Sequence, residues 1–366
     1  MLLFELIQVA LGQRDRLSHI PNKEEWGNLY AEIIKQSVAG VAFEGVQKLP
    51  KDQWPPQALL FEWIGLCEQI KNQNLVANRR SAEVTKLFSD AGFCSCILKG
   101  QGNAMMYPNP FVRMSGDIDI WVCPKSIMDE PTEKTIRATV NEFVKTQYPD
   151  TDEQDEHIEY PVFSDIPVEV HYKPGNLVRP KHNKRFVEYY NAQVKSQMNH
   201  AVELPQDMGK INVPTIEFNI IFQMMHMMNH FLVEGIGLRH FVDYYYVLQN
   251  NHLHNTDTTG IQNKFKEFGL LRFAKGVMWI EKECLGLGNE YLILEPDEKR
   301  GRVILKEMLE GGNFGHHDER YKSRKNGFIA RGIADGYRLL KLMTVFPSES
   351  MWKLYRKVEN QRWKLK

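Results

Sequence analysis

Hydrophobic residues recur at spacings of three and four over most of the first 90 positions. The segments 26–48 and 56–90 follow this pattern and are rich in Leu, Ala, Glu, Lys and Gln, which predicts amphipathic helices. Prolines interrupt the pattern between the two segments, and proline ends helices because it lacks the N–H donor. The second segment predicts one long helix from Gln57 to Ala91 that ends at Gly92.

From position 92 the pattern changes to short apolar runs bounded by Gly and Pro. Four such runs predict strands: CSCILKG (94–100), DIDIWVCP (117–124), HIEYPVF (157–163) and PVEVHYKP (167–174). Helices are expected at 102–107 and over 131–147. The segment 92–175 is therefore expected to form a compact α/β unit with the size of a small domain.

After position 175 the helical spacing returns. Helices are expected over 179–197, 215–232, 238–250, 261–285, 297–310, 324–344 and 348–362. The pattern divides the chain into an N-terminal helical region (1–91), an α/β core (92–175) and a C-terminal helical domain (176–366). The expected fold class is α+β, with a mixed sheet core flanked by N-terminal and C-terminal helical regions.

Composition and charge are those of an ordinary soluble globular protein. The chain has 366 residues, of which 43% are hydrophobic and 25% are charged, and it is too long for one small core. Its 46 basic and 46 acidic residues cancel. This balance argues against a long nucleic acid as partner, since proteins that bind one usually carry a basic stripe. No apolar run reaches the roughly 18 residues that span a bilayer, so no membrane partner is expected.

The cysteines favour a reducing compartment. There are five of them and no CxxC pair, which is typical of free thiols in a cytoplasmic protein. The apolar start MLLFELIQVALGQRDR has no basic leader and no small-residue cleavage site, so it predicts a first amphipathic helix rather than a signal peptide. The expected localisation is cytoplasmic.

Two aspartates interrupt the apolar run RMSGDIDIWV, residues 113–122. On a strand, Asp117 and Asp119 face the same side, and adjacent carboxylates repel each other unless a cation lies between them. Glu169 alternates with two valines in PVEVHY and offers a third carboxylate. Three carboxylates on one sheet face suit two Mg²⁺ ions and a phosphoryl or nucleotidyl transfer. The alternative is a solvated face on an edge strand.

The core motifs resemble a known family. They occur in the order LKG (98–100), Tyr107, Arg113, GDIDIWV (116–122) and VEVHY (168–172). This order resembles the uncharacterised nucleotidyltransferase family of bacteria, within the polymerase-beta-like nucleotidyltransferase superfamily. The likeness covers residues 98–172, and GIGLRHFVDYY (235–245) extends it. The chain departs from the superfamily at Gln101, where a small residue is usual, and in a long gap from the Gly turn to the DxD strand.

The resemblance implies a nucleotidyltransferase-type sheet and a reaction. A nucleoside monophosphate would pass from an NTP to a hydroxyl of a small molecule or protein, with release of pyrophosphate. Two Mg²⁺ ions, or Mn²⁺ in their place, would serve as cofactors. Asp117, Asp119 and Glu169 would be the catalytic and metal-binding residues.

The resemblance also implies a nucleotide-binding set, which comprises Lys99, Gly100, Gly102, Arg113 and Gly116. Lys99 either neutralises phosphate charge or is solvated on the outer face of its strand. Arg113 is either a phosphate clamp or a partner of Asp117. His171 shares a strand face with Glu169, and it either hydrogen-bonds a metal ligand or packs.

The C-terminal helices carry a second polar cluster, formed by His226, His230, Arg239, His240 and Asp243. His226 and His230 share a helix face, and Arg239 and Asp243 have the spacing of a pair across one turn. Three interpretations stay open: buried polar residues between helices, a lining for the acceptor side of the site, and a zinc site that would need further ligands.

The Gly-rich loop GGNFGHHDER (311–320) is unusually polar. It is either a plain surface loop or reaches over the active site, where His316, His317 or Arg320 would touch nucleotide or acceptor.

Three rival functions are compatible with the sequence. The first is a non-catalytic nucleotide-binding or interaction protein on the same fold. The second is a zinc hydrolase built on the helical histidines. The third is a phosphotransferase, which would release ADP instead of pyrophosphate.

Overall fold

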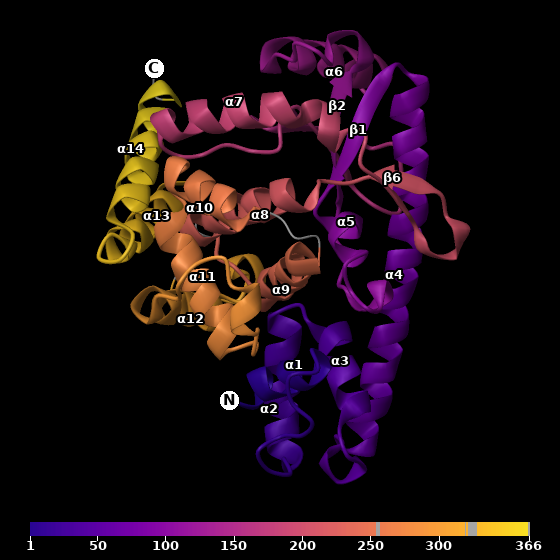
Figure 1. Ribbon diagram of the computed structural model, residues 1–366, viewed down its shortest axis with the longest axis vertical. Coiled ribbons are helices and arrows are strands. Elements are labelled where there is room, and N and C mark those ends of the chain that lie inside the picture. Colours follow the sequence, from indigo (N-terminus) through magenta and orange to yellow (C-terminus); the bar gives the residue numbers. More distant parts are fainter. Residues whose placement is uncertain (254–256, 319, 321–327, 365–366) are drawn as a thin grey trace.

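The computed structural model describes residues 1–366 apart from 254–256, 319, 321–327 and 365–366. Helices dominate, and a small sheet lies beside one end of a long helix that follows one side of the molecule (Figure 1). The N-terminal helices gather around the other end of that long helix.

The N-terminal region consists of four helices, α1 (Leu2–Ala10), α2 (Lys23–Lys35), α3 (Ala39–Lys48) and α4 (Gln57–Asp90). Asn22 caps α2 through a capping box with Glu25, which satisfies backbone donors of the first turn. Helix α4 has 34 residues and is roughly 50 Å long. It ends at Asp90, one residue before the predicted end at Ala91, and Gly92 follows with a φ of +87°. Because α4 contacts α3 at one end and β1 at the other, it joins the N-terminal helices to the sheet.

The main sheet has four strands, β1 (Phe93–Leu98), β2 (Ile118–Pro124), β3 (His157–Glu159) and β4 (Val168–His171). Their order is β1-β2-β4-β3, and β2–β4 is the parallel pair while the other two pairs are antiparallel. Helix α5 (Gly100–Ala104) follows β1, and α6 (Glu133–Gln147) lies between β2 and β3 in the chain and contacts β2. The predicted α+β class with a mixed sheet is confirmed.

The C-terminal part is helical, with α7 (Pro180–Gln197), α8 (Ile216–Val233), α9 (Leu238–Leu253), α10 (Thr258–Glu267), α11 (Leu271–Glu283), α12 (Glu298–Gly311), α13 (Phe328–Leu342) and α14 (Pro347–Lys364). The single helix expected over 261–285 is wrong, because Gly269 separates α10 from α11 with a φ of +73°. The helix expected over 324–344 begins at Phe328 among the described residues. Short 3-10 helices occur at Lys51–Gln53, Pro110–Val112, Lys125–Ile127, Pro205–Asp207, Asn289–Tyr291 and Asn313–Gly315.

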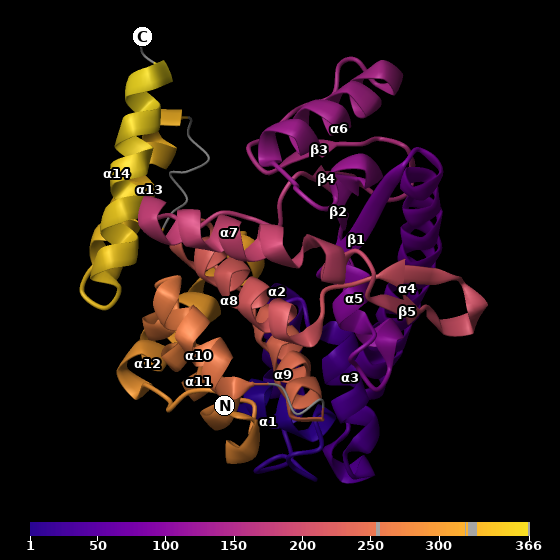
Figure 2. The ribbon, with the colours of Figure 1, turned by 45° about the horizontal axis from the view of Figure 1, so that its top comes forward.

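A small hairpin, β5 (Ala201–Glu203) and β6 (Lys210–Asn212), was not predicted. It lies beside β1 and α4 (Figure 2), and the Asn212 amide donates a 3.0 Å hydrogen bond to the Ser95 carbonyl. Elsewhere on the sheet, Trp121 of β2 stacks on Phe218 of α8. The sheet and the C-terminal helices therefore share one hydrophobic core.

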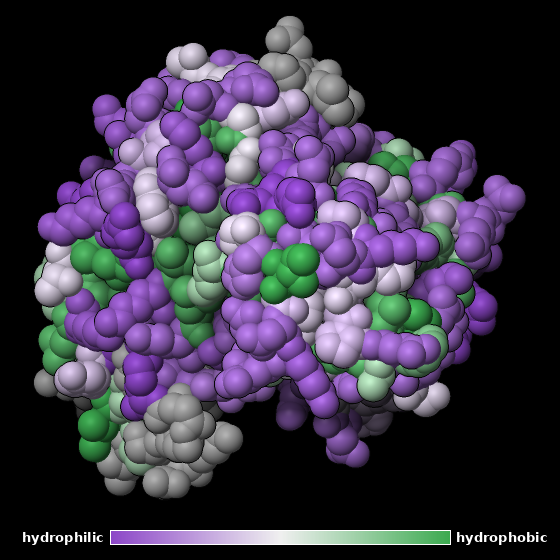
Figure 3. Space-filling view, turned by 90° about the horizontal axis from the view of Figure 1, so that it is seen from below, coloured by the Kyte–Doolittle hydropathy of each residue, from purple (hydrophilic) through white to green (hydrophobic). Residues whose placement is uncertain are grey.

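The end of the molecule that carries the N-terminal helices is mostly hydrophilic, with hydrophobic side chains in small separate groups (Figure 3). Ile34, Phe61 and Ile64 are among the exposed apolar residues of these helices, and scattered exposed residues of this kind are normal. Among the described residues, none of the helices combines the length and the apolar character that crossing a membrane requires.

Candidate functional site

The three predicted carboxylates converge at one edge of the sheet. Asp119 of β2 pairs in register with Leu98 of β1 and with Glu169 of β4, and Asp117 stands just before β2. One carboxylate oxygen from each acid lies within 4.8 Å of the others. Asp119 is 3% exposed, whereas Asp117 is exposed and Glu169 is half-buried. The cluster is therefore buried at Asp119 and open to solvent at Asp117.

Two cations lie against Asp119. Lys99 Nζ is 3.0 Å from Asp119 Oδ1, and His171 Nε2 is 2.9 Å from the same oxygen. Burial alone would raise the pKa of Asp119, but Lys99 and His171 outweigh it and hold this pKa well below its usual range. Burial would lower the pKa of His171, yet its contacts with Asp119 and Glu169 raise it to about 9. Asp119 is therefore ionised and His171 is positively charged in the metal-free protein.

Asp117 behaves differently from Asp119. The negative charge of Asp119 raises the pKa of Asp117. Asp117 and Asp119 are thus two neighbouring acidic groups, and both Lys99 and His171 contact Asp119. Carboxylate oxygens in this arrangement are the donor set that Mg²⁺ and other hard divalent cations prefer, so the residues present fit the ions that the resemblance implies.

The turn between β1 and α5 holds Lys99 in an unusual backbone conformation. Its φ is +53° and its ψ is −138°, which for a residue with a side chain costs about 1–3 kcal/mol. Its neighbour Gly100 also has a positive φ of +39°. This conformation directs Lys99 to Asp119, so the solvated outer-face alternative for Lys99 is wrong. Strain of this kind is often kept at functional sites.

The other two glycines have different surroundings. A Cβ on Gly102 would approach Val213 and the Ile97 carbonyl to 3.1 and 3.3 Å, so Gly102 permits close packing on its interior side. A Cβ on Gly116 would meet no atom within 4 Å, so the space around Gly116 is open. Their nucleotide-binding roles stay predictions.

Arg113 has a partner that the sequence did not indicate. Its Nε and Nη2 each donate a 2.8 Å hydrogen bond to Asp243 of α9, and the Tyr107 hydroxyl donates to the same carboxylate at 2.6 Å. This contact takes the place of two pairs that the sequence left open as alternatives, Arg239 with Asp243 and Arg113 with Asp117. Arg239 Nη1 instead donates to the Met114 carbonyl at 3.0 Å. Fixing Arg113 in this way anchors the segment that leads to Asp117.

Two buried asparagines of α4 hold the loops of the site. The Asn74 amide donates to the Arg113 carbonyl at 2.7 Å, and its oxygen accepts from the Ser115 hydroxyl at 2.7 Å. Asn78 accepts a hydrogen bond from the Gln101 amide. Sequence reasoning missed both residues, although an asparagine on the buried face of a helix is itself an unusual signal, because polar groups are buried only with partners.

The predicted helical cluster borders the site. The rings of His226 and His230 have centroids 4.3 Å apart, and His240 lies about 6 Å from both. Burial, followed by the charge of Lys99, lowers the pKa of His226 well below its ordinary value, and His171 contributes to the shift. His226 is therefore neutral and within electrostatic reach of Lys99 and His171.

The geometry does not assemble the zinc site that was one interpretation. Among the described residues, two groups of three bring their ligand atoms within 4.8 Å of one another, and the three helical histidines are not one of them. Instead, His230 Nδ1 lies 3.1 Å from Glu234 Oε2, and His240 Nδ1 lies 3.2 Å from the Gly237 carbonyl oxygen. His240 is buried and His230 is half-buried, and each is engaged by a polar group of its own helix or of a helix end.

The 311–320 loop contacts the histidines of α8 and α9 through Phe314, a residue that was not predicted. The ring of Phe314 lies 5.0 Å from His230 and 5.3 Å from His240. His316 and His317 are exposed. Arg320 contacts Glu307 of α12, so it forms part of the support of the loop. Glu319 lies outside the described residues.

A histidine that sequence reasoning missed joins the acidic cluster. His157 of β3 lies opposite His171 in the antiparallel register, and its Nδ1 is 3.5 Å from Glu169 Oε2. Burial lowers the pKa of His157 despite the nearby Glu169. The alternation in HIE was the sequence pattern that could have indicated His157. The pairing of this strand with VEVH, however, is visible only in the folded sheet.

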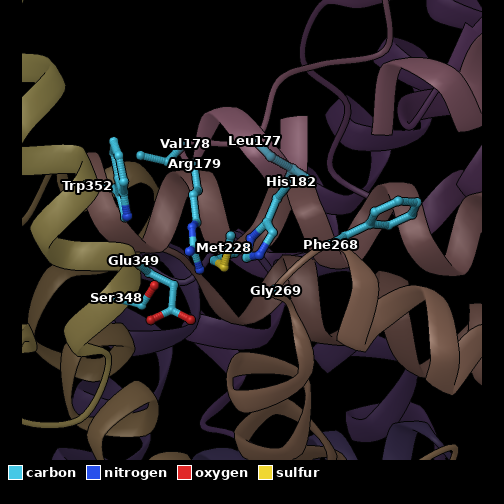
Figure 4. A pocket seen from close by; sticks show the side chains of 10 residues that line it. All are labelled: Leu177, Val178, Arg179, His182, Met228, Phe268, Gly269, Ser348, Glu349 and Trp352. Atoms are coloured by element: carbon cyan, nitrogen blue, oxygen red, sulfur yellow. The ribbon is translucent and has the colours of Figure 1, made fainter. Parts of the chain in front are cut away.

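A small pocket lies elsewhere, between α7, α8 and α14 (Figure 4). Arg179, His182, Glu349 and Trp352 are among its lining residues. None of the predicted site residues lines this pocket, so it is separate from the carboxylate cluster.

Comparisons with known proteins agree with the motif resemblance. No curated protein sequence matches the chain. The crystal structure of an antigenic nucleotidyltransferase-like protein from Paracoccidioides brasiliensis aligns with 62% of this chain and 96% of its own, at 9% identity and a TM-score of 0.35. This likeness is too low to support a conclusion. A model of the family described as uncharacterised nucleotidyltransferase matches residues 22–286. Since the match covers more than half of the chain, the protein belongs to the uncharacterised nucleotidyltransferase family.

Proposed function

We propose that the protein is a metal-dependent nucleotidyltransferase. It would transfer a nucleoside monophosphate from an NTP to a hydroxyl group of a small molecule or a protein, and release pyrophosphate. One observation carries the proposal: in a chain of this family, Asp117 just before β2, Asp119 of β2 and Glu169 of β4 bring their ligand atoms within 4.8 Å of one another.

Divalent cations fit this cluster because its donors are carboxylate oxygens that repel one another in the metal-free protein. Asp117 and Asp119 would hold the ions together with Glu169. Bound Mg²⁺ supplies charge neutralisation to the phosphates and activates the attacking oxygen. Glu169 keeps a lowered pKa, because its histidine neighbours outweigh the burial that acts to raise it. It is therefore ionised and able to accept a proton from the acceptor hydroxyl.

Positive charge for the triphosphate comes from two residues beside the acids. Lys99 contacts Asp119 from a strained turn. Arg239 donates to the Met114 carbonyl, and its buried Nε has no hydrogen-bond partner among the described residues. Arg113, in contrast, is neutralised by Asp243. We therefore assign phosphate binding to Lys99 and Arg239, and a positioning role to Arg113.

The acceptor would approach from the side of α8 and α9. His226 is neutral and within electrostatic reach of Lys99 and His171, so it can accept a hydrogen bond without repelling a cation. His230 and His240 continue this polar surface as far as Phe314. Such a lining suits a small polar molecule or a hydroxyl-bearing side chain.

The test uses NTPs labelled in two positions. The protein is incubated with Mg²⁺, each α-labelled or γ-labelled NTP, and fractionated small molecules or proteins as acceptors. We expect the α label to enter one acceptor fraction with release of pyrophosphate. Asp119→Asn should abolish the transfer, and Asp129→Asn is the matched control because Asp129 is 83% exposed and lies outside the cluster.

Two other results would replace the proposal. Transfer of the γ label with release of the diphosphate would make the protein a phosphotransferase. Mg²⁺-dependent NTP binding without transfer to any acceptor fraction would favour a non-catalytic nucleotide-binding protein.

A further inference from the structure

A second group of metal-binding side chains adjoins the acids. His157 and His171 are opposite each other on the antiparallel pair β3–β4, and opposite residues project on the same face of a sheet. Glu169 is two residues before His171, so it projects on that face as well. The ring centroids of the two histidines are 5.1 Å apart.

The distances within this group are those of co-ligands. Glu169 Oε2 lies 3.5 Å from His157 Nδ1 and 3.5 Å from His171 Nε2, which is longer than a good hydrogen bond. Two ligand atoms that are each about 2.0–2.1 Å from one tetrahedral ion are roughly 3.4 Å apart. All three residues bring one ligand atom within 4.8 Å of the others.

The side chains are also oriented and accessible. His171 Nδ1 is buried and has no hydrogen-bond partner among the described residues, while His171 Nε2 faces Glu169 and Asp119. The side chains of His157 and Glu169 are 20% and 29% exposed, so an ion and its water ligands can reach them. The group is therefore held on its inner side by the contact of His171 with Asp119 and is open on its outer side.

We propose that His157, Glu169 and His171 bind a divalent transition metal ion of the Zn²⁺ or Co²⁺ type. Two imidazoles and one carboxylate suit such ions, whereas Mg²⁺ prefers oxygen ligands. Glu169 also belongs to the oxygen-only cluster with Asp117 and Asp119. In this proposal two cation sites adjoin each other and share Glu169. One has only oxygen ligands, and the other has two imidazole ligands and one carboxylate.

This inference goes beyond the proposed function, with which it shares Glu169, and is tested without nucleotide. Co²⁺ is titrated into the metal-free protein while its visible d–d absorption and its binding stoichiometry by equilibrium dialysis are followed. The variants are His157→Ala, Asp117→Asn and Glu159→Ala. Glu159 is the matched control, since it lies on the same strand opposite Glu169 but outside the group.

We expect one Co²⁺ with nitrogen ligation in the wild type. His157→Ala should weaken it by at least about tenfold, while Asp117→Asn and Glu159→Ala keep it. His157 is on a short outer strand and partly exposed, and an unchanged melting temperature without metal would show that His157→Ala folds.

Two results would overturn the inference. One is Co²⁺ binding that His157→Ala leaves unchanged and Asp117→Asn removes, which would place the ion on the oxygen-only cluster. The other is no Co²⁺ binding by the wild type. Neither result contradicts Mg²⁺-dependent NTP binding, whose loss would instead contradict the proposed function.

Discussion

At the scale of single residues, Asp117 and Asp119 are chemically unequal although they are two positions apart. Asp119 is buried between Lys99 and His171 and remains ionised. Asp117 is exposed, and the charge of its neighbour raises its pKa. Asp119 therefore keeps its negative charge without a bound metal ion. A bound cation would stabilise the ionised form of Asp117 more than that of Asp119.

A buried carboxylate far from the site gives a prediction about stability. Glu281 of α11 is fully buried, and neither carboxylate oxygen has a hydrogen-bond partner among the described residues. Burial raises its pKa well above the ordinary value. The folded state thus keeps a proton that the unfolded state has lost, and stability falls as the pH rises from the unfolded pKa towards the folded one.

We expect Glu281→Gln to unfold at a higher urea concentration than the wild type at neutral pH. The difference should grow by up to about 1.4 kcal/mol per pH unit above the unfolded pKa and disappear at acidic pH, where both side chains are neutral. Urea midpoints at several pH values measure it. A difference that did not change with pH would show that Glu281 is not held neutral.

At the scale of elements, apolar patterns predicted the framework. β2 is buried throughout, and β1 and β4 are buried except at one half-buried position each. Helix α4 is long enough for its spacing to be clear. The hairpin β5–β6 was missed because AVE and KIN have only three residues each, which is too short for an alternation of apolar and polar residues to be recognised. The break between α10 and α11 was missed because Gly269 interrupts an otherwise continuous apolar spacing.

The sequence predicted those residues of the site that belong to a local alternation of apolar and polar positions, and it did not predict contacts between distant segments. The alternation in DIDI and VEV placed Asp117, Asp119 and Glu169 on common faces. The partnership of Arg113 with Asp243 joins residues 130 positions apart, and no local pattern contains that information. His157 needed the strand order, since it meets His171 only across β3 and β4.

The contact between α3 and the loop before β2 gives an element-scale prediction. A Cβ on Gly40 would lie 2.2 Å from the Val112 carbonyl oxygen, so Gly40→Ala must separate α3 from that loop. We expect a loss of about 1–3 kcal/mol of stability. Mg²⁺-dependent NTP affinity should also weaken, because the same loop leads to Asp117. Chemical denaturation and NTP titration measure the two effects.

Gly65→Ala is the control for this variant. Gly65 is an exposed residue inside α4, and a Cβ added to it would meet no atom within 4 Å. Alanine should therefore stabilise the helix by about 0.5–1 kcal/mol. Equal effects of the two substitutions would contradict the close contact at Gly40.

At the scale of the whole molecule, the site lies where three parts of the chain meet. Helix α4 supplies Asn74 and Asn78 to the site loops, the sheet supplies the acids, and α9 supplies Asp243. The buried pair of Arg113 and Asp243 connects the loop before β2 to the C-terminal helices.

Breaking this pair should be strongly destabilising, because a buried charge would lose its partner. We expect Arg113→Ala and Asp243→Ala each to lose about 3–5 kcal/mol. The double variant should lose clearly less than the sum, and a double-mutant cycle from denaturant midpoints measures the coupling. Single losses below about 1 kcal/mol, as for an exposed ion pair, would show that the pair does not hold the parts together.

The measurement that most directly tests the acidic cluster as a metal–nucleotide site is the melting temperature with each of the four NTPs, with and without Mg²⁺. The Asp117→Asn, Asp119→Asn double variant is measured beside the wild type. A ligand that binds only the folded protein raises its stability, by about 2.7 kcal/mol at a hundred times its Kd. We predict a Mg²⁺-dependent rise with at least one NTP that the double variant loses. No rise at saturating NTP and Mg²⁺, or a rise that the double variant keeps, would contradict a nucleotide site at Asp117 and Asp119.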